Sequence, residues 1–152
     1  MASPHPMSWF NGGGKGVRYI LNKLDRRNDF SGRYVLLNRR KPFYVGISRA
    51  VVRRLRQHVM GRQDFDASLA YRMATNKTGY KMKRREAMKD RDLRVAFDEA
   101  RKLIGSSSVA FISIENPLEL YLFEAYCAME LDTRKWNTFR THRTMTMTAI
   151  GS

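Results

Sequence analysis

The spacing of apolar residues predicts a helix, two strands and a second helix in the first half of the chain. Residues 17–27 and 49–60 carry apolar side chains three or four positions apart, which is the repeat of an amphipathic helix. Residues 34–37 and 43–47 are short apolar runs joined by a polar turn that ends in proline, a pattern typical of an antiparallel hairpin. Ser48 is expected to cap the helix that follows the hairpin.

The second half of the chain predicts two further helices, a third strand and a final helix. Residues 67–75 and 84–104 have helical spacing, and residues 109–114 alternate bulky and small side chains as a strand does. The sequence Asn-Pro-Leu-Glu at 116–119 combines an N-cap residue, an early proline and an early glutamate, which marks a helix start. This helix is predicted to run to about Leu131, and it is expected to be largely buried because it is apolar on almost every side.

This order of elements predicts an α+β fold, in which a small three-stranded antiparallel sheet is flanked by helices. Residues 1–16 are rich in proline, glycine and serine and are predicted to form a flexible N-terminal arm. Residues 17–143 are predicted to form a single domain, followed by a C-terminal tail at 144–152. A chain of 152 residues, 43% of them hydrophobic, is long enough to bury a core of that kind.

The charge of the chain narrows its partners, because 29 lysines and arginines stand against 14 acidic residues and give a formal net charge of +15. Such an excess favours a polyanionic partner such as a nucleic acid, although a membrane surface or ribosomal RNA would also attract it. Cys127 is the only cysteine, which excludes an internal disulfide and a cysteine-rich zinc site and fits a cytoplasmic setting. No apolar run approaches the roughly 20 residues that span a bilayer, so no membrane partner is expected.

Arg54 and His58 are four residues apart in the helix predicted at 49–60 and therefore lie on one row of its surface. That row borders the apolar stripe of the helix, where a partly buried site can form. The pair also has an explanation without chemistry, in which Arg54 is a surface residue and His58 covers the edge of the core.

Tyr34 and Tyr44 are separated by an even number of positions across the predicted hairpin. If even positions pair with even positions, both rings project from the same face of the sheet. Gly46 would then lie opposite or near Tyr34 and leave room for a ligand. Strand tyrosines also pack across a sheet without any catalytic role, and the spacing alone leaves both possibilities open.

Glu124 lies among apolar neighbours on the last predicted helix, where a carboxylate needs a cation or hydrogen-bond donors as partners. A metal ion would satisfy it, and so would a buried ion pair with an arginine. Glu119 of the same helix needs no such partner, because the helix start already explains it.

These residues together resemble the GIY-YIG nucleases. Residues 32–34 (Gly-Arg-Tyr) and 44–46 (Tyr-Val-Gly) are similar to the two signature tripeptides of that family, at the family's usual separation. Arg54 and His58 follow the second of those glycines by eight and twelve residues, as an arginine and a histidine do in the family. Arg33 departs from the apolar middle residue of the first tripeptide, and altered packing or an extra phosphate contact is expected from it.

The resemblance continues to the end of the predicted domain. The stretch LFEAYCAMELDTRKWNTF resembles the family's metal-ligand helix and the asparagine after it, which assigns these roles to Glu124 and Asn137. Asn137 would orient the site or contact phosphate. The spacing from Asn137 to Phe139 and His142 is similar to the end of stand-alone bacterial members of the family, and His142 is a weaker candidate for a supporting role.

The resemblance implies a metal-dependent endonuclease that hydrolyses phosphodiester bonds of a nucleic acid, with DNA as the expected substrate. Glu124 would hold Mg²⁺, with Mn²⁺ as the alternative, because one carboxylate and several waters suit this ion. Arg54 would stabilise charge on the phosphoryl oxygens. Tyr34, Tyr44 or His58 would act as general base for the attacking water, and the sequence does not decide among them.

Basic residues outside this constellation are expected to hold the nucleic acid backbone. They lie in the hairpin turn, on the helix after it and near the start of the long helix: Arg39, Arg40, Lys41, Arg53, Lys83 and Arg84. The stretch at 81–94 is mixed in sign and is equally well explained as a solvated helix face. A non-catalytic basic nucleic-acid-binding module on the same scaffold is the alternative function, and a basic structural protein of a ribonucleoprotein is a third. The oligomeric state is left open.

Overall fold

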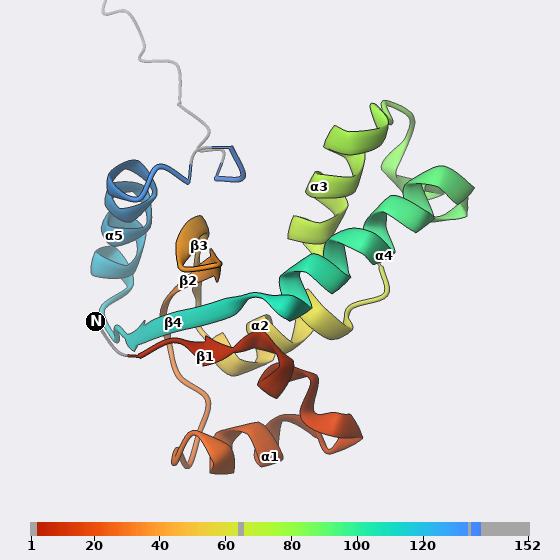
Figure 1. Ribbon diagram of the computed structural model, residues 1–152. Helices are drawn as coiled ribbons and strands as arrows, with labels where there is room; N and C mark the ends of the chain where they lie inside the picture. The colour runs from red at the N-terminus through yellow and green to blue at the C-terminus, as the bar shows by residue number, and fades with distance from the viewer. Residues whose placement is uncertain (1–2, 64–65, 134, 138–152) are drawn as a thin grey trace, which may run out of the picture.

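The computed structural model describes residues 3–63, 66–133 and 135–137 (Figure 1). His142 and the predicted tail at 144–152 lie outside these residues. The described elements run in the order β1 (His5–Pro6), 3₁₀-helix η1 (Met7–Gly14), α1 (Gly16–Lys23), β2 (Gly32–Asn38), β3 (Lys41–Ser48), α2 (Val51–Met60), α3 (Ser68–Thr78), 3₁₀-helix η2 (Arg84–Lys89), α4 (Arg91–Ser106), β4 (Ser108–Ser113) and α5 (Pro117–Glu130). The α+β class is therefore confirmed.

The sheet has four antiparallel strands in the order β1-β4-β2-β3, so the prediction of three strands is wrong by one. The additional strand is short: His5 pairs with Val109 and Pro6 with Ser108. It arises from the segment that was predicted to be a flexible arm. β3 forms the opposite edge of the sheet, and the hairpin β2–β3 therefore has one outward-facing side.

The prediction of a flexible arm is wrong for residues 5–14, because two of their side chains belong to the core. Met7 and Phe10 have no exposed surface, and η1 packs against α1, α2 and α4. The backbone N–H of Met7 also donates to the carbonyl oxygen of Ser107, the C-cap residue of α4 just before β4. The glycine-rich composition of this segment conceals the two apolar side chains that anchor it.

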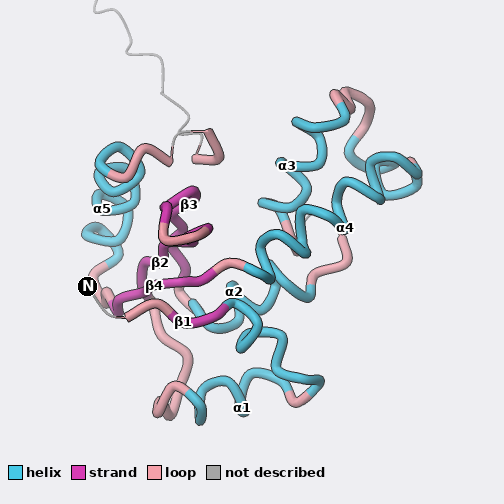
Figure 2. The backbone as a smooth tube through the Cα atoms, in the orientation of Figure 1, coloured by secondary structure: helices cyan, strands magenta, loops and turns pink. Residues whose placement is uncertain are grey.

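The elements lie in layers around the β2–β3 hairpin. Figure 1 shows α5 on one side of the hairpin and the α3–α4 pair on the other, with α2 and α1 below. Figure 2 shows in the same orientation that the strands form a small centre within a mostly helical molecule. The largest buried cluster joins residues of η1, α2 and α4 to one face of the sheet, and burial of this apolar surface is the main stabilising contribution.

The hairpin is joined by a two-residue turn at Arg39 and Arg40, shorter than the polar turn that the sequence predicted. Both turn residues adopt left-handed backbone angles, with φ of 46° and 68°. Two such residues give the turn the twist that neighbouring strands require. The pairing is interrupted between Leu36 and Leu37, where β3 carries one additional residue, Phe43, and forms a bulge.

Two helices, α2 and the one predicted at 84–104, begin differently from the prediction. Ala50, not Ser48, is the N-cap of α2, and the Asp29 carboxylate accepts hydrogen bonds from the backbone N–H groups of Val52 (2.8 Å) and Arg53 (2.9 Å). A carboxylate suits this place because the first N–H groups of a helix lack partners within the helix. The helix predicted at 84–104 is interrupted at Asp90, where η2 ends and α4 begins.

α5 begins as predicted, with the side chain of Asn116 accepting from the N–H of Leu118 (2.9 Å). The prediction that this helix is largely buried is wrong, since only Leu120 and Ala128 are buried. Its exposed apolar residues are Leu118, Tyr121, Leu122, Phe123, Tyr126 and Met129. Of the described elements, only β2 and β3 pack closely against α5, so its other faces stay exposed. None of the described helices combines the length and the apolar character needed to span a bilayer.

Candidate active site

Three aromatic side chains from the hairpin and α2 form an enclosed cluster. Tyr34 pairs with Gly46 and Leu36 with Tyr44, so even positions face even positions and both tyrosines share a sheet face, as predicted. Their ring centroids lie 6.2 Å apart, and the His58 ring lies 5.7 Å from Tyr34 and 5.8 Å from Tyr44. Tyr34 Oη and His58 Nε2 are hydrogen-bonded at 2.7 Å.

Position 46 requires a glycine because the Tyr34 ring occupies the space where a side chain would lie. A Cβ at Gly46 would be 2.2 Å from Cζ of Tyr34. The prediction that this glycine leaves room for a ligand is therefore wrong, since the room is filled by the tyrosine opposite. Position 32, at the start of the first tripeptide, requires a glycine for a similar reason: a Cβ there would be 2.2 Å from the carbonyl oxygen of Ile112 on β4.

Arg54 lies half-buried beside the cluster and is held only by neutral groups. Its Nη2 donates to Ser68 Oγ at 2.7 Å, and its Nη1 donates to Gln57 Oε1 and to the carbonyl oxygen of Asp66, both at 3.2 Å. Within the described residues it forms no ion pair with a carboxylate. A guanidinium fixed by neutral acceptors keeps its full charge available for an anion.

Glu124 lies on α5, which packs against β3 and β2 on the other side of the hairpin from α3 (Figure 1). Burial raises the pKa of its half-buried carboxyl. Its negative charge is near enough to raise the pKa of both tyrosine phenols, as a smaller contribution beside their burial. No hydrogen bond or ion pair to Glu124 occurs in the part of the chain that the structure describes. The buried ion pair that the sequence left open is therefore not formed by these residues.

Burial sets the protonation of the cluster. It lowers the pKa of His58 to about 3, helped by the positive charge of Arg54, so this imidazole is neutral at physiological pH. Burial also raises the pKa of Tyr34 well above its ordinary value, and raises that of Tyr44. The second ring nitrogen of His58, Nδ1, is buried without a hydrogen-bond partner among the described residues.

Arg72 on α3 is a charged neighbour of the cluster that sequence patterns did not single out. Its positive charge lowers the pKa of Tyr44, against the larger effect of burial. Its Nη1 donates to the carbonyl oxygen of Trp136, which ties α3 to the segment after α5. The available signal was weak, since Arg72 is one basic residue in a helix whose position relative to the hairpin is a matter of tertiary packing.

Asn137 contacts the backbone of β3 next to Tyr44. Its Oδ1 accepts from the N–H of Val45 at 2.9 Å, and its Nδ2 donates to the carbonyl oxygen of Val45 at 2.6 Å. It thus satisfies the backbone N–H and C=O groups of one residue of the edge strand β3, as a neighbouring strand would. Both ends of its amide are used in this way, which makes it a positioning residue for the strand that carries Tyr44.

Arg33 extends from the other face of β2 and contacts α5. Its guanidinium lies 5.5 Å from the Phe123 ring centroid and donates to Cys127 Sγ. Of the two expectations for Arg33, the structure gives altered packing: this residue joins the sheet to the helix that carries Glu124.

The predicted backbone-binding residues are on the surface. Arg39 and Arg40 form the exposed hairpin turn, with Lys41 beside them, and Arg53 is exposed on α2. Lys83 and Arg84 lie at the start of η2, where Arg84 packs 5.0 Å from the ring centroid of Tyr71. Contact with nucleic acid remains a prediction for all six.

The described residues contain no group of three or more histidine, cysteine, aspartate or glutamate side chains that could hold a metal ion. A site here would therefore rely on the single carboxylate of Glu124, with water and substrate oxygens as the other ligands. A half-buried carboxylate that has no partner among the described residues fits Mg²⁺, since this ion retains several of its waters as ligands.

Comparisons with protein-family models, with curated proteins and with solved structures give no match.

Proposed function

We propose that this chain is a metal-dependent endonuclease of the GIY-YIG type, which hydrolyses phosphodiester bonds in a nucleic acid, with DNA as the expected substrate. The observation that carries the proposal is the convergence of Tyr34, Tyr44, Arg54 and His58, with Glu124 on the opposite side. These residues come from β2, β3, α2 and α5, and they combine two phenols with a guanidinium and a carboxylate that form no ion pair among the described residues. Packing alone does not require that combination.

The charges on the two sides of the cluster suit a phosphodiester. Arg54, with Arg72 near Tyr44, supplies positive charge for the non-bridging oxygens, where a fork of N–H donors is most effective. Glu124 would hold a divalent ion, which supplies charge stabilisation at the leaving oxygen when bound. The net charge of +15 would draw the polyanion to the surface.

The hydrogen bond between Tyr34 and His58 supports a positioning role for the histidine. With its proton on Nδ1, neutral His58 accepts the Tyr34 hydroxyl hydrogen at Nε2 and fixes the direction of that phenol. Burial keeps both groups neutral, because it lowers the pKa of His58 and raises the pKa of Tyr34. Of the three candidate bases, Tyr44 is the half-buried one, so the attacking water would be positioned there.

The experiment is nicking of supercoiled plasmid by the purified chain with Mg²⁺ or Mn²⁺, beside EDTA. Glu124→Gln should lower the rate about 100-fold or more, because the ion contributes several kcal/mol to the transition state. Glu130→Gln is the matched control, since Glu130 is exposed on the same helix, and it should cleave as the parent does. Equal activity in the two variants would remove Glu124 from the mechanism.

Single-stranded DNA and RNA complete the substrate set. Salt-sensitive binding to every nucleic acid offered, with no cleavage in either metal, would replace the nuclease by the non-catalytic binding module.

A further inference from the structure

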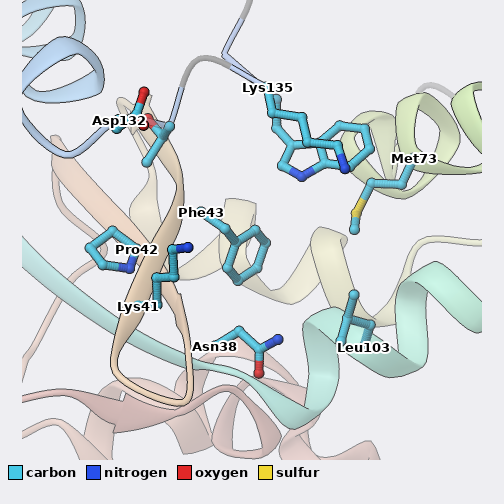
Figure 3. A pocket seen from close by; sticks show the side chains of 10 residues that line it. Asn38, Lys41, Pro42, Phe43, Met73, Leu103, Asp132 and Lys135 are labelled. Carbon is cyan, nitrogen blue, oxygen red and sulfur yellow. The ribbon is translucent and has the colours of Figure 1, made fainter.

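A groove beside the catalytic cluster has a composition that the proposed chemistry does not use. It has a volume of about 400 Å³ and lies between the β2–β3 hairpin, α3, α4 and the turn after α5. Its apolar lining consists of Phe43, Met73, Leu103 and Trp136, with Pro42. Figure 3 shows the Phe43 ring turned into the space, with Met73 and Leu103 opposite it. A second hollow of about 420 Å³ shares Met73, Leu103 and Trp136 and continues the groove along α3 and α4.

Two lysines lie beside this aromatic surface. Lys41 and Lys135 line the groove, and the Lys135 ammonium lies 4.9 Å from the Trp136 ring centroid. Asp132 also lines it, and in the second hollow Lys77 is paired with Glu99. Aromatic faces with ammonium groups at their edge suit a flat ring system that carries anionic groups on one side.

The groove and the catalytic cluster are formed by neighbouring residues of the same elements. Phe43, which lines the groove, directly precedes Tyr44, and consecutive Cα atoms are about 3.8 Å apart. On the other wall Met73 follows Arg72, whose charge acts on Tyr44 and whose guanidinium binds the Trp136 carbonyl. A strand with one phosphate at the cluster would place a neighbouring nucleotide at the groove.

We propose that this groove binds an unpaired nucleobase of the strand being cut, stacked on Trp136. The proposal rests on the proposed function and narrows its substrate to nucleic acid that is single-stranded, or locally opened, beside the cleavage point. A base within a duplex cannot enter, because its faces are covered by stacked neighbours, whereas an unpaired or extruded base has both faces free.

The test uses Trp136 as its own reporter. The chain has two tryptophans, so in Trp9→Phe all tryptophan fluorescence comes from Trp136 and the groove is unaltered. Trp9 lies on η1, where it contacts Lys23 and His5. In EDTA, a single-stranded oligonucleotide should quench this fluorescence, while a blunt duplex of equal length, shown to be bound by anisotropy, should not. Trp136→Phe, which keeps only Trp9, should lose the quenching.

Affinity gives a second measurement on the same oligonucleotides. Trp136→Ala should weaken single-strand binding about 5- to 100-fold and leave duplex binding unchanged, which is the range for loss of one stacked base. Equal quenching by duplex and single strand would overturn the inference. So would a bound single strand that leaves Trp136 unquenched, or a Trp136 that acrylamide cannot reach in the free protein, since another segment or copy would then fill the groove.

The two proposals fail in different ways. Plasmid nicking that depends on Glu124 together with an unquenched Trp136 removes the base site alone. Quenching by single strands with no cleavage of any substrate removes the nuclease and leaves a binding groove.

Discussion

Two adjacent residues of β3, Phe43 and Tyr44, lie in different environments. Beside Tyr44, the side chains of Tyr34 and His58 are enclosed, hydrogen-bonded to each other and neutral, with Tyr34 only 1% exposed and His58 fully buried. Around Phe43 the side chains line an open groove with ammonium groups at its rim. The difference teaches that a strand with one bulge can carry part of an enclosed aromatic cluster next to part of an open apolar groove.

The same distinction separates the forces that hold the two regions. The enclosed cluster depends on close approach and fixed hydrogen-bond geometry, so it tolerates little change in volume. The groove depends on accessible apolar and aromatic surface, which adapts to an occupant. Disturbing each region should therefore have different consequences, and the largest should come from the enclosed one.

Gly46→Ala should produce the largest effect, because its methyl group would lie 2.2 Å from Cζ of Tyr34. The ring is buried and hydrogen-bonded to His58, so it cannot move aside cheaply. We expect a loss of about 3 kcal/mol in the free energy of unfolding, measured with urea, and loss of cleavage with it. Gly105→Ala in α4 is the matched control, with its nearest atom at 3.7 Å, and should be neutral or slightly stabilising. An equally small change in both variants would show that the cluster can yield as the groove does.

Acidification should destabilise the fold through His58. The unfolded imidazole takes up a proton near pH 6.5, whereas the folded one does so only near pH 3, so between these values the unfolded state binds more protons. Stability is complete above pH 6.5 and falls as the pH drops towards 3, by about 2 kcal/mol at pH 5.0. Urea unfolding of the parent and of His58→Gln at pH 7.5 and 5.0 isolates this contribution from the carboxyl groups. Identical pH dependence in the two proteins would mean that the cluster is not closed to water.

Asn137→Ala should have the smallest effect of the three. It removes two buried hydrogen bonds to Val45, and because each contributes about 1 kcal/mol or less net, we expect a loss of about 1.5 kcal/mol in stability. Asn22→Ala, at an exposed position of α1, is the control and should be neutral. Because Asn137 joins the strand of Tyr44 to the turn that carries Trp136, its loss should also weaken the Trp136 quenching by single strands. Unchanged quenching would show that the groove keeps its structure without the contact between Asn137 and the strand of Tyr44.

Local patterns were sufficient for the parts of the fold whose causes are local. The even spacing of Tyr34 and Tyr44 and the cap at Asn116 each depend on residues close in the sequence, and both predictions are confirmed. The row that joins Arg54 and His58 in one helix also follows from local geometry. The full burial of His58 does not, because it depends on the ring of Tyr34 in the hairpin.

The errors concern contacts between distant segments. Met7 and Phe10 are buried by helices far along the chain, which a glycine-rich composition does not reveal. The apolar character of α5 predicts burial, but the sequence pattern of a helix does not show whether another element covers it. Arg72 and the groove depend on how α3 is placed against the hairpin, and no spacing in the sequence encodes that.

Arg33 and Tyr34 are adjacent in β2 but face opposite sides of the sheet, one contacting α5 and the other His58. A shift of one residue in the pairing of β2 with β3 would exchange them, because every side chain of a strand changes face together. The arginine would then bring a positive charge into the apolar surroundings of His58, at a high cost in free energy. The charge of Arg33 thereby disfavours the wrong alignment during folding, so the residue that joins the sheet to α5 also protects the fidelity with which the hairpin assembles.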